Sequence, residues 1–178
     1  GVPAYRGKME LLRTEDGIAV INELPLEEYL YSVVPSEMPA SYPAEALRAQ
    51  AICARTYAYG HMLYAAYPQY GAHVDDSTAF QVYNNITEQE STTAAVKDTY
   101  GQLLCTGDGE LAETFYYSTS CGVGSDANVW KTQAAPGLTY LKAREISPEA
   151  MENLLCQTGA AQTTGTADAG EDLAERLR

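Results

Sequence analysis

The sequence is poor in basic residues and has no long hydrophobic run. It contains 11 Lys and Arg against 24 Asp and Glu, which gives a formal net charge of −13 at pH 7. Such a chain repels polyphosphate, and its basic residues are scattered, so we expect no nucleic-acid partner. No run of about 18 apolar residues occurs, and we therefore predict no transmembrane segment in this chain.

Cysteine pairs with metal-binding spacing are also absent. The cysteines are Cys53, Cys105, Cys121 and Cys156, and no two of them form a Cys-x-x-Cys motif. Zinc-finger spacing is therefore missing, and we predict neither a metal site nor a cofactor. Four cysteines allow two disulfides, but their spacing does not say which residues pair.

The aromatic residues are mainly tyrosine, with 14 Tyr against two Phe and one Trp. A tyrosine combines an apolar ring with a hydroxyl at its tip, which suits a sugar-binding groove as well as the rim of a core. The length of 178 residues and the apolar fraction of 46% are sufficient for a domain with its own core.

The first part of the chain predicts a hairpin and then a helix. Residues 8–13 and 18–22 flank Asp16-Gly17, a pair typical of hairpin turns. A helix is expected to begin at Pro25 and to end before Pro35, because a proline disfavours helical backbone at the residue before it. Its predicted buried face consists of Leu26, Tyr29, Leu30 and Val33.

A second helix is predicted from about residue 43 to residue 66, with Ser41 as its cap. A stripe of mostly small residues on one face lets other elements approach closely, so this helix is expected to be central and buried. The stripe consists of Leu47, Ala51, Ala54, Ala58 and Met62.

The second half of the chain predicts further short elements. A capping box at Thr87 opens a helix that ends near Asp98. A second hairpin is expected over residues 102–117, and a last helix over 147–157. Hairpins and helices without regular βαβ alternation indicate an α+β fold. We assign residues 1–157 to one domain and residues 158–178 to a flexible linker with a short charged end.

The stretch from Pro35 to Pro39 carries the candidate catalytic group. Glu37 lies between two prolines, with Ser36 and Met38 as its neighbours. These prolines restrict the connection between two predicted helices, and a general acid needs a carboxyl group held in one position. The alternative interpretation is that Glu37 only helps the following helix to begin.

Several separate stretches match one known family, in order and at compatible spacing, over roughly residues 5–142. The matching stretches are Tyr5-Arg6-Gly7, Val20-Ile21-Asn22, Glu28-Tyr29-Leu30, Pro35-Ser36-Glu37-Met38-Pro39, residues 46–51 and 54–58, Phe80-Gln81-Val82-Tyr83 and residues 115–120. Together they resemble the stage II sporulation protein D family, which includes the amidase-enhancer proteins.

This resemblance implies a lytic transglycosylase of peptidoglycan, with Glu37 as its catalytic acid. Sporulation members cut the β-1,4 bond after N-acetylmuramic acid (MurNAc) and leave a 1,6-anhydro end, preferably on strands from which an amidase has removed the stem peptides. The expected partners are thus peptidoglycan glycan strands and an amidase that acts upstream. The expected compartment is extracytoplasmic, at the septum during engulfment.

Further substrate-binding residues are predicted around Glu37. Ser36 and Met38 flank it, and Gln50 and Arg55 are polar residues in the predicted central helix. Arg55 has a structural alternative, in which it fixes a loop by bonding carbonyls or a carboxylate. Gln81 and Tyr83 alternate along a predicted strand and would point the same way. Hydroxyl groups near the end of another strand complete the set, from Tyr117, Ser118 and Ser120.

The sequence departs from the family at two places. Some members bind zinc through Cys-Asp-Thr-Thr-His-Cys, whereas residues 75–80 here read Asp75-Asp76-Ser77-Thr78-Ala79-Phe80. We therefore expect no zinc of that type. Cys121 also stands where the family has a glycine, which places a side chain in a loop of the expected groove.

These departures leave two alternatives to catalysis by Glu37. The chain is either a glycan-binding or amidase-enhancing module without catalytic activity, or a cysteine hydrolase built on Cys121 with His61 or His73. The second alternative has no recognisable spacing of nucleophile and base.

Overall fold

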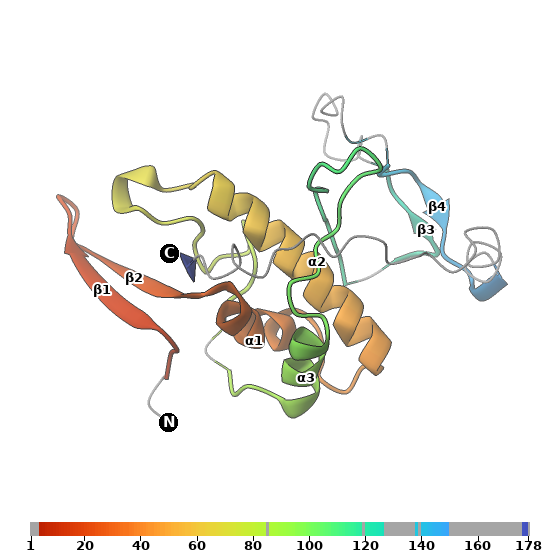
Figure 1. Ribbon diagram of the computed structural model, residues 1–178, viewed down its shortest axis with the longest axis horizontal. Helices are drawn as coiled ribbons and strands as arrows, with labels where there is room; N and C mark the ends of the chain where they lie inside the picture. Colours follow the sequence, from red (N-terminus) through yellow and green to blue (C-terminus); the bar gives the residue numbers. More distant parts are fainter. Residues whose placement is uncertain are drawn as a thin grey trace. The chain divides into compact units, whose positions relative to one another are not determined.

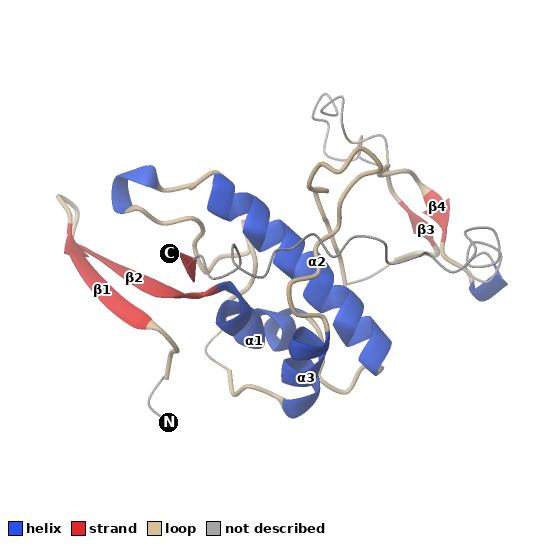
Figure 2. Ribbon diagram, in the orientation of Figure 1, coloured by secondary structure: helices blue, strands red, loops and turns tan. Residues whose placement is uncertain are grey.

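The structure is a computed structural model that describes residues 4–84, 86–118, 120–126, 138, 140–149 and 176–177. The chain divides into two compact units. The first takes in Gly1–Phe115 and Asp168–Arg178, and the second takes in Tyr116–Ala167. Helices and antiparallel strands follow one another without βαβ alternation in these residues, which confirms the α+β class (Figure 2).

The first unit begins with the predicted hairpin. Strands β1 (Lys8–Arg13) and β2 (Ile18–Pro25) pair antiparallel, and the Thr14 N–H donates to the Gly17 carbonyl at 2.8 Å across the turn. The Asp-Gly signal is thus confirmed. Strand β5 (Arg176–Leu177) pairs with the end of β2, where Leu24 faces Leu177.

Gly7 allows the residues before the hairpin to reach the rest of the unit. Its φ is +83°, and a Cβ there would lie 2.1 Å from the carbonyl oxygen of Glu23. No other residue fits this position without moving the backbone. Beyond it, Arg6 binds the Glu88 carboxylate, with one N–H at 3.0 Å, and Tyr5 stacks on Tyr83.

Helix α1 (Leu26–Glu37) buries the predicted face and then passes the predicted stop. Leu26, Tyr29, Leu30 and Val33 are all buried. Pro35 lies inside the helix, so the prediction that it ends α1 was wrong. The turn around Pro35 is held by other bonds, from the Ser36 hydroxyl to the Ser32 carbonyl at 2.6 Å and from the Met38 N–H to the Val34 carbonyl at 3.0 Å.

Helix α2 (Ala44–Leu63) presents the predicted stripe to the core but begins differently. Leu47, Ala51, Ala54 and Ala58 are buried, and Met62 packs at the edge of the core. The cap is Pro43, whose extended backbone begins the helix without a side-chain hydrogen bond. The predicted Ser41 cap was therefore wrong, and α2 ends three residues before the expected residue 66.

Helix α3 (Glu90–Asp98) ends at the predicted residue but begins late. Its cap is Gln89, and no side chain bonds the cap, so the expected capping box at Thr87 does not form. Two contacts hold this segment outside the helix. Glu88 is paired with Arg6, and the Gln89 amide donates to the Thr87 carbonyl at 3.0 Å.

The three helices of the first unit pack against one another around one hydrophobic core (Figure 1). Helix α1 supplies half of the buried side chains of this core, and the small residues of α2 let α2 approach closely. Each large apolar side chain buried here contributes about 1.5–3 kcal/mol relative to exposure. The core consists of Leu24, Leu26, Tyr29, Leu30, Val33, Val34, Ala51, Ala54, Ala58 and Val96.

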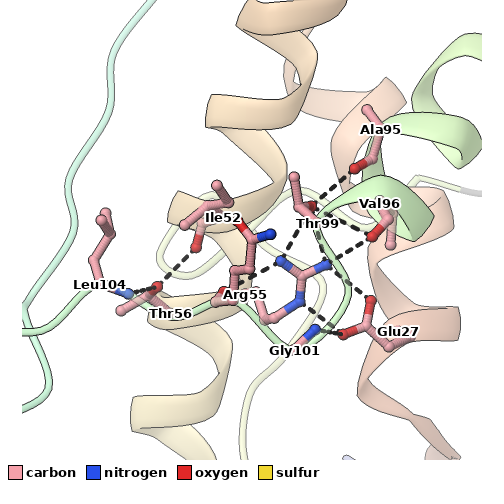
Figure 3. Close-up of polar contacts among 10 residues, drawn as sticks. Glu27, Ile52, Arg55, Thr56, Ala95, Val96, Thr99, Gly101 and Leu104 are labelled. Carbon is pink, nitrogen blue, oxygen red and sulfur yellow. Dashed lines mark hydrogen bonds and ion pairs between the residues drawn. The ribbon is translucent and has the colours of Figure 1, made fainter. Parts of the chain in front are cut away.

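A fully buried arginine joins the helices at the edge of this core (Figure 3). Arg55 of α2 is 0% exposed, and its guanidinium donates to both carboxylate oxygens of Glu27 in α1, at 2.7 and 2.9 Å. It also donates to the Val96 carbonyl in α3 at 3.0 Å and to the Gln102 carbonyl at 3.3 Å. One side chain thus fixes two helices and a loop to α2.

The second predicted hairpin forms only near its turn. Cys105 and Leu111 make one antiparallel bridge, and the Thr106 N–H donates to the Glu110 carbonyl at 2.8 Å. Side-chain bonds attach its two arms to α2. Thr56 accepts the Leu104 N–H at 3.0 Å, and the Thr114 hydroxyl donates to the Cys53 carbonyl at 2.8 Å.

The described part of the second unit holds one short antiparallel pair, β3 (Val123–Gly124) with β4 (Arg144–Glu145). Most of the predicted helix over 147–157 and the whole linker over 158–170 lie outside the described residues. The described cysteines, Cys53, Cys105 and Cys121, are free thiols. In the same residues, no helix is both long and apolar enough to cross a membrane.

We predict that Arg55→Met destabilises the fold by about 3–5 kcal/mol, because it leaves the Glu27 carboxylate buried without its cation. The double variant with Glu27→Met should be more stable than Arg55→Met alone. Urea unfolding measures both. Arg48→Met, which removes a solvent-exposed pair with Asp98, is the control and should barely move the midpoint. Equal shifts for Arg48→Met and Arg55→Met would contradict this role.

A second stability prediction concerns His61, which packs between the rings of Tyr57 and Phe80 at 4.5 and 5.2 Å. Burial lowers the pKa of His61 below its ordinary 6.5, and the charge of Glu113 opposes this only in part. The unfolded chain therefore binds the proton more readily than the folded protein does. Stability is consequently lost as pH falls from the ordinary pKa toward the lowered pKa of His61 in the folded protein.

His61→Phe keeps a ring in place and removes this proton uptake. Relative to wild type, the variant should gain stability between about pH 7 and about pH 5, measured by urea unfolding at each pH. A constant difference across that range would show that His61 does not cause the effect.

Candidate active site

The candidate acid Glu37 is the last residue of α1 rather than part of a loop between helices. Its side chain is partly exposed, and one carboxylate oxygen, Oε1, accepts the N–H of Val82 at 2.7 Å. Among the described residues, Val82 is the one that donates a hydrogen bond to the Glu37 carboxyl group. It fixes the direction of a side chain whose backbone is already fixed by the helix.

The segment that supplies this N–H is held on both sides of Val82. Gln81 is 1% exposed, and its amide donates to the Ala54 carbonyl at 3.2 Å and accepts the Tyr29 hydroxyl at 3.4 Å. Tyr83 stacks on Tyr29 with ring centroids 5.2 Å apart. Gln81 and Tyr83 therefore both contact Tyr29.

The predicted strand through Gln81 and Tyr83 does not form, because the segment pairs with no neighbouring strand and is fixed by side chains instead. The Tyr83 hydroxyl donates to Asn22 of β2 at 3.1 Å. Burial raises the pKa of Tyr83, while a hydrogen bond to Ser32 works the other way. The hydroxyl thus keeps its proton near neutral pH and remains a donor.

Other predicted groove residues take different roles around Glu37. The Ser36 hydroxyl is bonded within its own helix, and Met38 caps α1. Gln50 is 6% exposed, and its amide nitrogen has no hydrogen-bond partner among the described residues. Because buried donors are rarely left unpaired, this amide is a candidate for binding a ligand. A role for Gln50 in substrate binding stays a prediction.

Arg55 does not line a groove. Its side chain is completely buried, and every bond given above joins it to another part of the protein. The bonds to a carboxylate and two carbonyls are those of the structural alternative. The assignment of Arg55 to direct substrate binding is therefore corrected, because no atom of it is accessible.

Tyr117, Ser118 and Ser120 belong to the second unit, whereas Glu37 belongs to the first. All three side chains are exposed. The Ser120 hydroxyl accepts the Gly122 N–H at 3.1 Å and so closes a local turn. The left-handed backbone of this turn belongs to Gly122, at φ +96°, next to the unexpected Cys121. A contact of these residues with substrate stays a prediction.

The stretch from Asp75 to Phe80, where the resemblance raised the question of a zinc motif, is organised by hydrogen bonds. Asp75 accepts the Ser77 N–H at 2.8 Å and the Tyr67 hydroxyl at 2.6 Å. A hydrogen bond from the Ser77 side chain, together with these two bonds, lowers the pKa of Asp75. Among the described residues, no three His, Cys, Asp or Glu side chains gather as metal ligands would.

Two groups that hold this site were not identified from the sequence. A backbone N–H is present at almost every position, so nothing marked Val82 as the partner of Glu37. Tyr29 was expected only as part of a buried helix face, yet its hydroxyl and ring hold both Gln81 and Tyr83. Tyr29 and Gln81 are far apart in the sequence, so their contact can be recognised only in the folded structure.

We predict that Gln81→Leu weakens the support of Val82 and leaves the Ala54 carbonyl and the Tyr29 hydroxyl without their partner. Each such loss costs about 1–3 kcal/mol of folding free energy. Urea unfolding measures this cost. Gln102→Leu, a change at an exposed side chain, is the matched control. A Gln81→Leu variant as stable as that control would refute the support by Gln81.

The sequence is similar to known proteins over much of its length. The sequence model described as "Stage II sporulation protein" matches residues 14–105, which include Glu37, Arg55, Gln81 and Tyr83. Stage II sporulation protein D of Bacillus amyloliquefaciens is 34% identical over 172 residues, covering 82% of this chain and 50% of the relative. The corresponding protein of Bacillus subtilis is 36% identical over 162 residues, covering 79% and 47%.

An amidase enhancer of Bacillus subtilis is also similar, with 39% identity over 117 residues that cover 65% of this chain and 15% of the enhancer. The chain spans about half the length of the two sporulation relatives. The matched family model extends over more than half of the chain. This chain therefore belongs to the stage II sporulation protein D family.

Proposed function

We propose that this protein is a peptidoglycan lytic transglycosylase in which Glu37 is the catalytic acid. The observation that carries the proposal is the position of its carboxyl group, fixed by the end of α1 and by the Val82 N–H on Oε1. In the described residues this bond leaves Oε2 for a substrate. A positioned carboxyl group within a family that acts in sporulation is the basis of the assignment.

One carboxyl group can perform the whole reaction. Glu37 donates its proton to the glycosidic oxygen between MurNAc and N-acetylglucosamine (GlcNAc), and the bond from the anomeric carbon to that oxygen breaks. The 6-hydroxyl of the same MurNAc attacks the anomeric carbon and returns its proton to Glu37. No water is consumed, and the product carries a 1,6-anhydro ring. Ordinary glycosidases need a second carboxylate because water or the enzyme is the nucleophile.

The biological setting follows from the same proposal. The substrate is the glycan strand of the wall, stripped of stem peptides by an amidase that acts first. The reaction then takes place outside the cytoplasmic membrane, in septal wall degradation during engulfment. The names of the sporulation relatives and of the amidase enhancer support this setting.

A second candidate function is a module that binds glycan or stimulates an amidase without cutting. The identity of 39% with the amidase enhancer favours it. The two functions differ in one observable: only a transglycosylase creates new anhydro ends.

The test is a digest of amidase-stripped glycan strands, with products identified by mass spectrometry. Wild type should produce 1,6-anhydro ends, and Glu37→Gln should be at least about 100-fold slower, as expected from the loss of a general acid. Glu28→Gln, the same change on the same helix, is the control and should retain activity.

Three outcomes would count against the proposal. Products one water heavier would indicate a hydrolase, and an active Glu37→Gln variant would exclude Glu37 as the acid. Retention of glycan without any cleavage would favour the binding module.

A further inference from the structure

A pocket of about 620 Å³ lies between the β1–β2 hairpin and the loop around η1 (Pro68–Tyr70), both in the first unit. Side chains of the hairpin form one wall, with Met9 and Val20 each at least half exposed. Aromatic side chains supply much of the remaining lining. They are Tyr5, Tyr29, Tyr67, Tyr70 and Tyr83.

Three of these rings form a column at the pocket. Tyr83 lies between the other two, 5.2 Å from Tyr29 and 6.1 Å from Tyr5, with interplanar angles of 20° and 29°. The innermost ring, Tyr29, is buried, and the outermost, Tyr5, is 46% exposed. The column therefore presents rigid aromatic surface to whatever enters the pocket. Tyrosine also places a hydroxyl next to each apolar face.

Two carboxylates give the pocket a negative side. Asp75 and Asp76 both line it, and Asp75 is held in place by Tyr67 and Ser77. An apolar ligand without hydroxyl groups would strip water from these carboxylates without replacing its hydrogen bonds. A ligand with a carboxylate of its own would be repelled by them, in a chain whose net charge is already −13.

We propose that this pocket is a carbohydrate subsite that takes a GlcNAc unit of the glycan strand and disfavours MurNAc. A pyranose ring has C–H faces that stack on tyrosine and hydroxyl groups that donate to carboxylates. GlcNAc is uncharged, whereas MurNAc carries a lactyl carboxylate once its peptide has been removed. The same strand therefore contains one sugar that fits Asp75 and Asp76 and one that they repel.

The pocket is connected to the candidate acid through the chain. Tyr83 lines the pocket, and the residue before it, Val82, donates its N–H to Glu37, which does not itself line the pocket. A strand that occupies the pocket and extends to the carboxyl group would have its register set by which sugar occupies the subsite. The inference deepens the proposed function and rests on it for the identity of the strand.

The test uses the full chain with Glu37→Gln, so that nothing is cleaved, and measures binding by titration calorimetry. Chitotriose, which contains only GlcNAc, should bind. Tyr70→Ala should weaken its binding by about tenfold, as expected from the loss of one aromatic contact and its buried area. Tyr100→Ala, a change at a tyrosine outside the pocket that is 58% exposed, is the matched control and should leave binding unchanged.

The charge preference is tested with the GlcNAc–MurNAc disaccharide. It should bind less tightly than chitotriose, and the difference should shrink at high salt because screening weakens the repulsion. Asp76→Asn, a nearly isosteric change at an exposed residue, should improve binding of the disaccharide and leave chitotriose almost unaffected.

The proposal is overturned if chitotriose does not bind, if Tyr70→Ala binds it as well as the control does, or if Asp76→Asn leaves the preference unaltered. Its failure is distinguishable from failure of the proposed function. If wild type forms anhydro ends but Tyr70→Ala does not weaken binding, the transglycosylase proposal holds and the subsite proposal fails. If Tyr70→Ala weakens the binding of chitotriose but no anhydro ends form, the subsite proposal holds and the transglycosylase proposal fails.

Discussion

The buried guanidinium of Arg55 is the interaction on which the first unit depends. A charged group taken out of water must be surrounded by partners, so α1, α3 and the loop at Gln102 can pack on α2 only where they bring a carboxylate or a carbonyl to it. Glu27 lies near the start of α1, and Glu37 ends the same helix ten residues later, about 15 Å along its axis. Fixing the start of this helix therefore helps to fix where its last carboxyl group points.

Tyr29 makes the second connection, between the helix core and the loop that faces Glu37. It belongs to the buried face of α1, yet its hydroxyl and ring contact Gln81 and Tyr83 on either side of Val82. The backbone N–H that holds Glu37 is thus supported by the same core that holds the helix. In this chain the neighbouring loop is closed by hydrogen bonds among Asp75, Tyr67 and Ser77. A loop closed by hydrogen bonds keeps its carboxylates available to line a pocket.

The parts that were predictable from the sequence were those encoded locally. The Asp16-Gly17 turn and the buried faces of α1 and α2 follow from turn chemistry and helical periodicity, and the structure contains them. The misplaced boundaries at Pro35 and Thr87 have tertiary or side-chain causes. Ser36 and Met38 maintain the turn around Pro35, and Arg6, 82 residues away, holds Glu88. The role of Arg55 needed its partners to be known, because a polar residue in a buried helix fits a binding site and a structural ion pair equally well. Glu37 itself was found through its flanking residues and the family they resemble.

The central claim is that the side chain at position 37 contacts the glycosidic oxygen of the bound strand. The most direct measurement is a crystal structure of the Glu37→Gln variant with a peptide-free tetrasaccharide of alternating GlcNAc and MurNAc. The account predicts the oxygen between MurNAc and GlcNAc about 3 Å from the substituted side chain, with the Val82 N–H still bonded to that side chain on its other side. A tetrasaccharide bound elsewhere, with position 37 facing only solvent, would contradict it.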